Sequence, residues 1–150
     1  MGPGVDEKFD DMLSSLGKVA QRHAKPVIDS VMRWRKSQNE PASQDVVHHH
    51  LSQSSSAPRV LRTPDVPQAL NERKRLASAY IMCRALIAVS RSISKDGLPE
   101  AIGHNLEELI FEQFRRHDPK LTMHSANYRS IADLHAALLG HLAELRYAQL

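Results

Sequence analysis

The chain contains one cysteine, few aromatic residues and no long hydrophobic run. Cys83 is the only cysteine among 150 residues, so an internal disulfide is excluded, which agrees with a reducing compartment. Aromatic residues make up 5% of the sequence, and this argues against a nucleic-acid platform that stacks single-stranded bases on exposed rings. No apolar stretch approaches the roughly 18 residues of a membrane-spanning helix.

The amino-terminal residues also lack the features of a targeting signal. The run from Met1 to Glu7 is acidic where a secretory signal would be basic and then apolar. Position 6 is Asp6, whereas an N-myristoylation site requires Ser or Thr there. We therefore expect a cytoplasmic or nuclear protein.

Length and composition are those of one ordinary globular domain. Hydrophobic residues account for 41% of the chain, enough for a real core at this length. The formal charge is +3 and the isoelectric point about 9.2, with acidic and basic residues interspersed as on solvated surfaces. A nucleic-acid-associated helical domain stays open as an alternative, and it would require Lys and Arg to gather on one face.

Apolar residues recur at helical spacing and predict an all-α fold without strands. The five predicted helices cover residues 6–23, 26–38, 67–95, 99–117 and 125–150. The short connection at Ala24–Lys25 predicts that the first two pack as an antiparallel pair, with Pro26 at the first helical position. The third helix carries two apolar stripes, so we expect it to be covered on two sides.

Three residues illustrate the predicted core. Leu86 of the third helix and Leu109 of the fourth are expected to be buried. Cys83 lies between Tyr80 and Ile87 on an apolar stripe, where a thiol behaves as a small hydrophobic group. We therefore do not interpret Cys83 as a nucleophile.

The segment 39–65 differs in composition from the rest of the chain. It is rich in Ser, Pro, His and Gln and predicts a disordered loop inside the domain. His48, His49 and His50 carry imidazoles that suit transition metals. Consecutive histidines in a flexible loop cannot all face one ion, however, and no pattern of Cys, Asp or Glu completes a zinc motif. We expect no metal and no cofactor.

No spacing points to a catalytic site, so we expect a protein that is not an enzyme. Asp133 and His135 stand two apart on a helix and therefore do not face each other. The residues Arg33, Trp34 and Arg35 are candidates for a protein-binding edge, because Trp and Arg are common anchors at interfaces. The ordinary alternative is a helix end whose cations are solvated.

Several strings, taken in order, resemble the amino-terminal region of the Furry family, which includes the fungal cell morphogenesis proteins. They are KPVIDSVMRWRKSQ (25–38), ERKRLASAYIMCRALI (72–87), LEELIFEQ (106–113) followed by Asp118–Pro119, and LLGHLAELR (138–146). The resemblance implies that residues 1–150 form a segment of a long HEAT- or armadillo-like α-solenoid that is not an enzyme. The resemblance also implies that the protein acts together with NDR-type kinases and their Mob coactivators in polarised growth, at the cell cortex.

A solenoid segment leaves an apolar side for the next repeat. The last predicted helix runs to the end of the sequence without a stop signal, and Leu138, Leu142 and Leu145 line its apolar side. We therefore expect these three leucines to be exposed and available for protein binding. Exposed apolar patches drive association, so the isolated chain is expected to self-associate.

Overall fold

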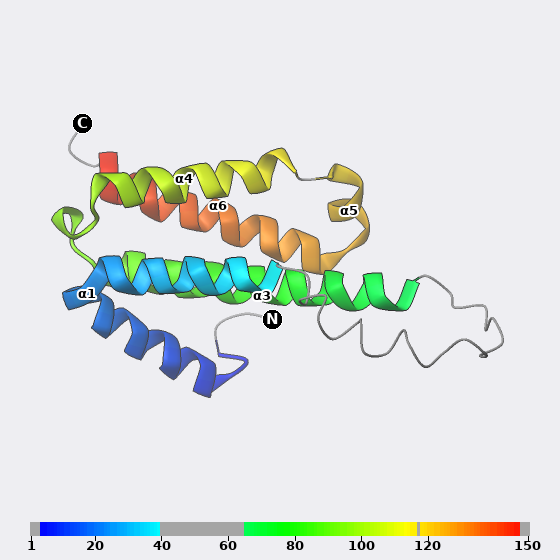
Figure 1. Ribbon diagram of the computed structural model, residues 1–150, viewed down its shortest axis with the longest axis horizontal. Helices are drawn as coiled ribbons and strands as arrows, with labels where there is room; N and C mark the ends of the chain where they lie inside the picture. Colours follow the sequence, from blue (N-terminus) through cyan, green and yellow to red (C-terminus); the bar gives the residue numbers. More distant parts are fainter. Residues whose placement is uncertain (1–3, 40–64, 117, 148–150) are drawn as a thin grey trace, which may run out of the picture.

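The computed structural model describes residues 4–39, 65–116 and 118–147, and this part of the chain is helical and without strands. Figure 1 shows its elements: α1 (Glu7–Asn39), α3 (Asp65–Ser92), the 3-10 turn η1 (Lys95–Gly97), α4 (Glu100–Arg115), α5 (Pro119–His124) and α6 (Ala126–Tyr147). The all-α prediction is confirmed. The predicted loop and its three histidines lie outside the described residues, apart from the loop's end positions 39 and 65, which belong to α1 and α3.

Helix α1 bends sharply at His23, which has non-helical backbone angles of φ −136° and ψ 51°. Pro26 follows three residues later; it lacks an N–H, and its ring clashes with the carbonyl four residues before it, so it kinks a helix. The predicted division at residues 24–25 is thus observed as a bend slightly earlier. Figure 1 shows the two halves of α1, residues 7–22 and 24–39, diverging from this point.

Helix α3 is central, with α1 packed on one side and α6 on another. This arrangement confirms that α3 is covered on two sides, as its two apolar stripes predicted. Its buried residues include Met82, Cys83, Leu86 and Val89. Helix α4 packs on α6, to which it contributes Ile102, Leu106 and Ile110 as buried residues.

Leu86 is buried as predicted, whereas Leu109 is only partly buried and lies at the margin of the core. Leu106 and Ile110 stand four residues apart and so share one side of α4, and this side faces the core. Leu109 lies at the edge of this side and packs against the core while partly exposed, so the expectation that it is a core residue is met only in part.

The short helix α5 was not expected from the sequence. Asp118 caps it by accepting a hydrogen bond from the Lys120 N–H at 2.9 Å, and Pro119 occupies the first helical position. The pair Asp118–Pro119 comes directly after the fourth predicted helix, and it starts this short helix. Among the described residues, no helix combines the length and apolarity needed to cross a bilayer.

Candidate functional site: an apolar groove between α1 and α3

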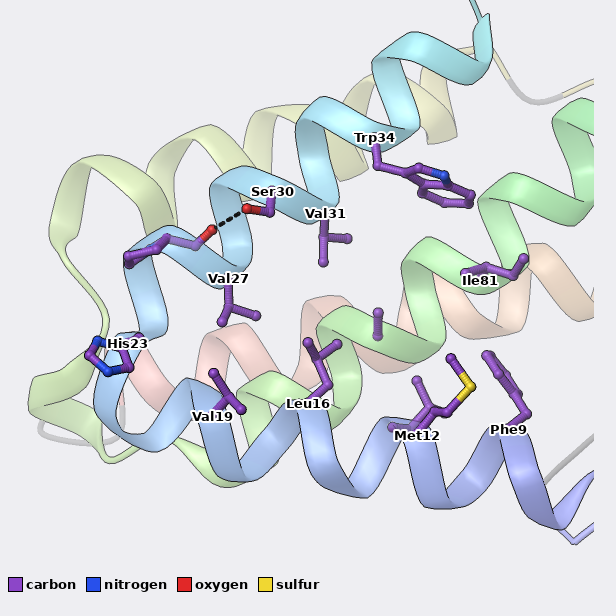
Figure 2. A pocket seen from close by; sticks show the side chains of 13 residues that line it. Phe9, Met12, Leu16, Val19, His23, Val27, Ser30, Val31, Trp34 and Ile81 are labelled. Atoms are coloured by element: carbon purple, nitrogen blue, oxygen red, sulfur yellow. Dashed lines mark hydrogen bonds between the residues drawn. The ribbon is translucent and has the colours of Figure 1, made fainter.

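The two halves of α1 and part of α3 enclose an open apolar groove of about 630 Å³, which we call the α1 groove. Figure 2 shows His23 at the bend, with Phe9 and Trp34 at the opposite end. The groove is lined by Phe9, Met12, Leu13, Leu16, Val19, His23, Pro26, Val27, Ser30, Val31, Trp34, Ile81 and Ala85.

The groove exists because each half of α1 is apolar over more of its circumference than α3 can cover. In the first half, Leu13 and Ala20 are buried, whereas Met12 is 68% exposed and Val19 is 52% exposed. The second half buries Ile28 and leaves Trp34 half-exposed. Exposed apolar side chains gathered in one concave place mark a binding surface more often than scattered ones do.

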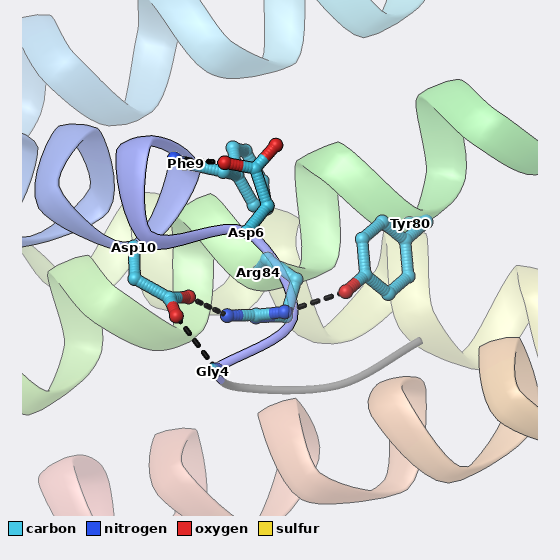
Figure 3. Close-up of polar contacts among 6 residues, drawn as sticks. All are labelled: Gly4, Asp6, Phe9, Asp10, Tyr80 and Arg84. Atoms are coloured by element: carbon cyan, nitrogen blue, oxygen red, sulfur yellow. Dashed lines mark hydrogen bonds and ion pairs between the residues drawn. The ribbon is translucent and has the colours of Figure 1, made fainter.

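Arg84 of α3 fixes the first half of α1 (Figure 3). Its guanidinium donates to Asp10 Oδ1 at 2.7 Å and to the Tyr80 hydroxyl at 2.5 Å, and it lies 5.3 Å from the centre of the Phe9 ring. The second carboxylate oxygen of Asp10 accepts from the Gly4 N–H at 2.7 Å. Gly4 has a φ of +85°, a conformation that suits glycine. This cluster holds one wall of the groove in place.

The predicted binding edge at residues 33–35 is not one surface. Arg33 is exposed and Trp34 lines the α1 groove. Arg35 is only 7% exposed, and its Nη1 donates to Ser78 Oγ at 2.8 Å. Successive helical residues differ by about 100° in direction, so residues 33–35 point three different ways. Arg35 is the one that faces the interior. Burial lowers the pKa of Arg35. The prediction that Arg35 lies on an exposed binding edge is therefore wrong.

The predicted exposure of the α6 leucines is also wrong. Leu138 and Leu142 are 0% exposed, and Leu145 is partly buried against the same core. Helices α3 and α4 of this chain already cover α6. The open apolar surface therefore lies on α1, at Met12 and Val19. A sequence signal for it existed, since apolar residues spread around α1 more widely than one neighbouring helix can bury.

A second cavity of about 360 Å³ lies where α3, α4 and α6 meet, with Arg75, Tyr128 and His135 among its lining residues. The Nδ1 of His135 bonds the Ile131 carbonyl at 2.9 Å, so that nitrogen carries the proton. Burial lowers the pKa of His135 and keeps the ring neutral. Burial, followed by the hydrogen bond to Glu72, raises the pKa of Tyr128.

Cys83 does not have the surroundings of a reactive cysteine. Cys83 is fully buried, and burial raises the pKa of its thiol to about 12, so the reactive thiolate is scarce at neutral pH. Within residues 4–39, 65–116 and 118–147, no three His, Cys, Asp or Glu side chains are grouped to hold a metal ion. The α1 groove is instead suited to non-covalent binding of an apolar surface.

Fold and groove thus define an all-helical protein with an open apolar groove on one side. Residues 72–150 match the family described as cell morphogenesis N-terminal, and the chain belongs to this family. This agrees with the sequence resemblance to the Furry-like morphogenesis proteins.

Two relatives extend the match over α1. The chain is 24% identical over 229 aligned residues to the cell morphogenesis protein PAG1 of Saccharomyces cerevisiae, covering 98% of this chain and 9% of that protein. It is 29% identical over 146 residues to the cell polarity protein mor2 of Schizosaccharomyces pombe, covering 96% of this chain and 6% of that protein. The chain therefore spans a small part of the length of these relatives. No solved structure matches it significantly.

Proposed function

We propose that the chain is a non-enzymatic scaffold segment that acts in cell morphogenesis and polarised growth. The observation that carries this proposal is the family match over residues 72–150, together with relatives named for morphogenesis and polarity. The α1 groove supports a binding role, since it offers exposed apolar side chains and few polar groups. A scaffold works through such surfaces rather than through reacting groups.

We further propose that the segment belongs to a HEAT- or armadillo-like helical stack. In such stacks each helix pair contacts mainly its neighbours, so that a central helix is covered on two sides. The position of α3 between α1 and α6 supports this architecture. The nucleic-acid alternative would require Lys and Arg to gather on one face, whereas Arg84 and Arg146 pair with Asp10 and Glu107.

The partners proposed for the scaffold are an NDR-type kinase and its Mob coactivator, in the cytoplasm at the cell cortex or at sites of polarised growth. This proposal rests on the resemblance to the Furry family. Purified kinase and coactivator should bind the scaffold that contains this segment, and deletion of the segment should weaken that binding. Equal binding with and without the segment would place the contact elsewhere.

A replacement experiment tests the morphogenesis role directly. The matching segment of mor2 in Schizosaccharomyces pombe is replaced by this chain, because the alignment with mor2 covers 96% of this chain. We expect the chimera to support polarised growth, whereas mor2 without the segment should give misshapen cells. A chimera that is made at normal levels but gives the deletion phenotype would contradict the proposed function.

A further inference from the structure

We propose that the α1 groove binds one amphipathic helix of a separate partner protein, a helix with an apolar face and acidic flanks. This inference deepens the proposed scaffold function, on which it rests for the expectation of a protein partner. Four features carry it: the length of the groove, its lack of available polar groups, the charge of its edges and its position in the fold.

The length of the groove fits a helix. Its first wall extends from Phe9 to His23 along α1, and 14 residues at about 1.5 Å each give roughly 21 Å, or four helical turns. The lining residues Met12, Leu16 and Val19 repeat at helical spacing. Their side chains form ridges against which a third helix can pack, which is the helix-in-groove mode of recognition.

The chemistry of the groove excludes an extended peptide. An extended segment must find partners for its backbone N–H and C=O groups, whereas a helix satisfies most of them internally. Ser30 is one of the few polar side chains here, and its hydroxyl already donates to the Pro26 carbonyl at 2.7 Å (Figure 2). The occupant must therefore present apolar side chains and hydrogen-bond its own backbone.

The edges of the groove are basic. Lys8 and Arg22 flank the first wall, and Arg33 flanks the second, each one helical turn from a lining residue. All three are exposed, and none makes an ion pair with another described residue. Asp6 and Asp11 are exposed acids near the first wall, while Asp29 is paired with Lys25 at 2.8 Å, so the three cations leave a small excess of positive charge. Acidic flanks on the occupant would complement this excess.

Sedimentation distinguishes a second copy of this chain from a separate partner as the occupant of the groove. Helices α4 and α6 lie across α3 from the first half of α1 (Figure 1), and none of their residues lines the groove.

Trp34 provides the readout, since it is the only tryptophan of the chain and lines the groove. The probe is a synthetic helical peptide of about 15 residues with Leu on one face and Glu on both flanks. A control peptide of the same length carries Lys in place of every Glu. We expect saturable binding of the Glu peptide with a blue shift of Trp34 emission, and binding of the Lys peptide at least about tenfold weaker.

The chain offers a matched pair of variants. Met12→Asp places a charge in the groove, whereas Met123→Asp makes the same change at a methionine of α5 that is 75% exposed and does not line the groove. Met12→Asp should weaken binding of the Glu peptide at least about tenfold, while Met123→Asp should bind as wild type. Val19→Asp replaces Met12→Asp if circular dichroism shows that the latter unfolds. Lys8→Glu combined with Arg22→Glu should reverse the preference between the two peptides.

Three results would overturn the proposal. They are absence of binding by either peptide, equal binding of both peptides, and a dimer in sedimentation that Met12→Asp dissociates, which would make the occupant a second copy. These outcomes are separable from failure of the proposed function. A wild-type chimera that supports polarised growth while neither peptide binds would leave the morphogenesis role intact and remove only the helix-binding groove.

Discussion

At the scale of single residues, Arg84 links the first half of α1 to α3 beside the groove. Its side chain is 11% exposed, and it joins α3 to Asp10 at 2.7 Å across a sequence separation of 74 residues. The aromatic rings of Phe9 and Tyr80, whose centres are 6.3 Å apart in a stacked arrangement, lie 5.3 and 5.5 Å from the guanidinium. A cation held this way has both a charged partner and favourable contact with the rings.

Replacement of Arg84 by Met keeps much of the apolar stem and removes the charge. Hydrogen bonds to charged groups contribute about 1.5–3 kcal/mol, and Asp10 is partly solvated, so we expect a loss of about 1–2 kcal/mol in the free energy of unfolding. Urea unfolding measures it, and amide exchange should rise in residues 7–22. Arg91→Met, at an exposed position of the same helix, is the control. Equal losses for both variants would contradict the assigned role of Arg84.

His135 makes stability depend on pH. Burial holds its pKa below the ordinary 6.5, so the unfolded chain takes up a proton at a higher pH than the folded chain. The contribution of neutral, buried His135 to the free energy of unfolding is therefore complete above about pH 6.5. This contribution is lost progressively as the pH falls below that value. We expect the drop in unfolding free energy between about pH 7.5 and 5.5 to be smaller in His135→Phe.

The matched control for this titration is His124→Phe, at an exposed position of α5. It should retain the acid sensitivity of the wild type. Chemical unfolding at the two pH values gives the comparison. The account of His135 is wrong if His135→Phe and the wild type lose the same free energy over this interval.

At the scale of elements, Gly17 sets the distance between α1 and α3. A Cβ at this position would lie 2.3 Å from Ser92 Oγ and 3.3 Å from the Ala88 carbonyl oxygen. Glycine lowers helix stability by about 1 kcal/mol relative to alanine, so its presence inside a helix calls for a packing reason. The close approach of α3 supplies that reason.

Gly17→Ala should therefore destabilise the fold, because overpacking at about 1–3 kcal/mol outweighs the gain in helix propensity. The double variant Gly17→Ala with Ser92→Ala should recover part of the loss. Gly140→Ala, at a helical glycine with open space around it, should instead stabilise by up to about 1 kcal/mol. Thermal unfolding measures all three. A stabilised Gly17→Ala variant would mean that α1 and α3 are not so close.

The sequence predicted most elements because their signals are local. Helical spacing, Pro26 and the Asp118–Pro119 pair are visible within a few residues. Helix α5 was missed because six residues are too few to show a period. Whether residues 7–22 and 24–39 pack as an antiparallel pair depends on tertiary contacts, and the bend at His23 shows only that they change direction.

At the scale of the whole molecule, the sequence identified the family and the all-α class but misplaced the open surface. Leu142 and Met12 both belong to apolar stripes at helical spacing, yet Leu142 is 0% exposed and Met12 is 68% exposed. The difference arises because α3 and α4 cover α6, whereas only part of α1 is covered. Periodicity identifies an apolar side of a helix, but it does not identify the neighbour that buries it.

The central claim is that this segment supports polarised growth by binding a partner in the α1 groove. The most direct test is the mor2 chimera of Schizosaccharomyces pombe carrying either Met12→Asp or Met123→Asp, with chimeric protein levels measured in each strain. We predict that cells with Met123→Asp grow with normal polarity, and that cells with Met12→Asp lose it at equal protein level. Full polarity with Met12→Asp, or with Met12→Asp and Val19→Asp together, would contradict the claim.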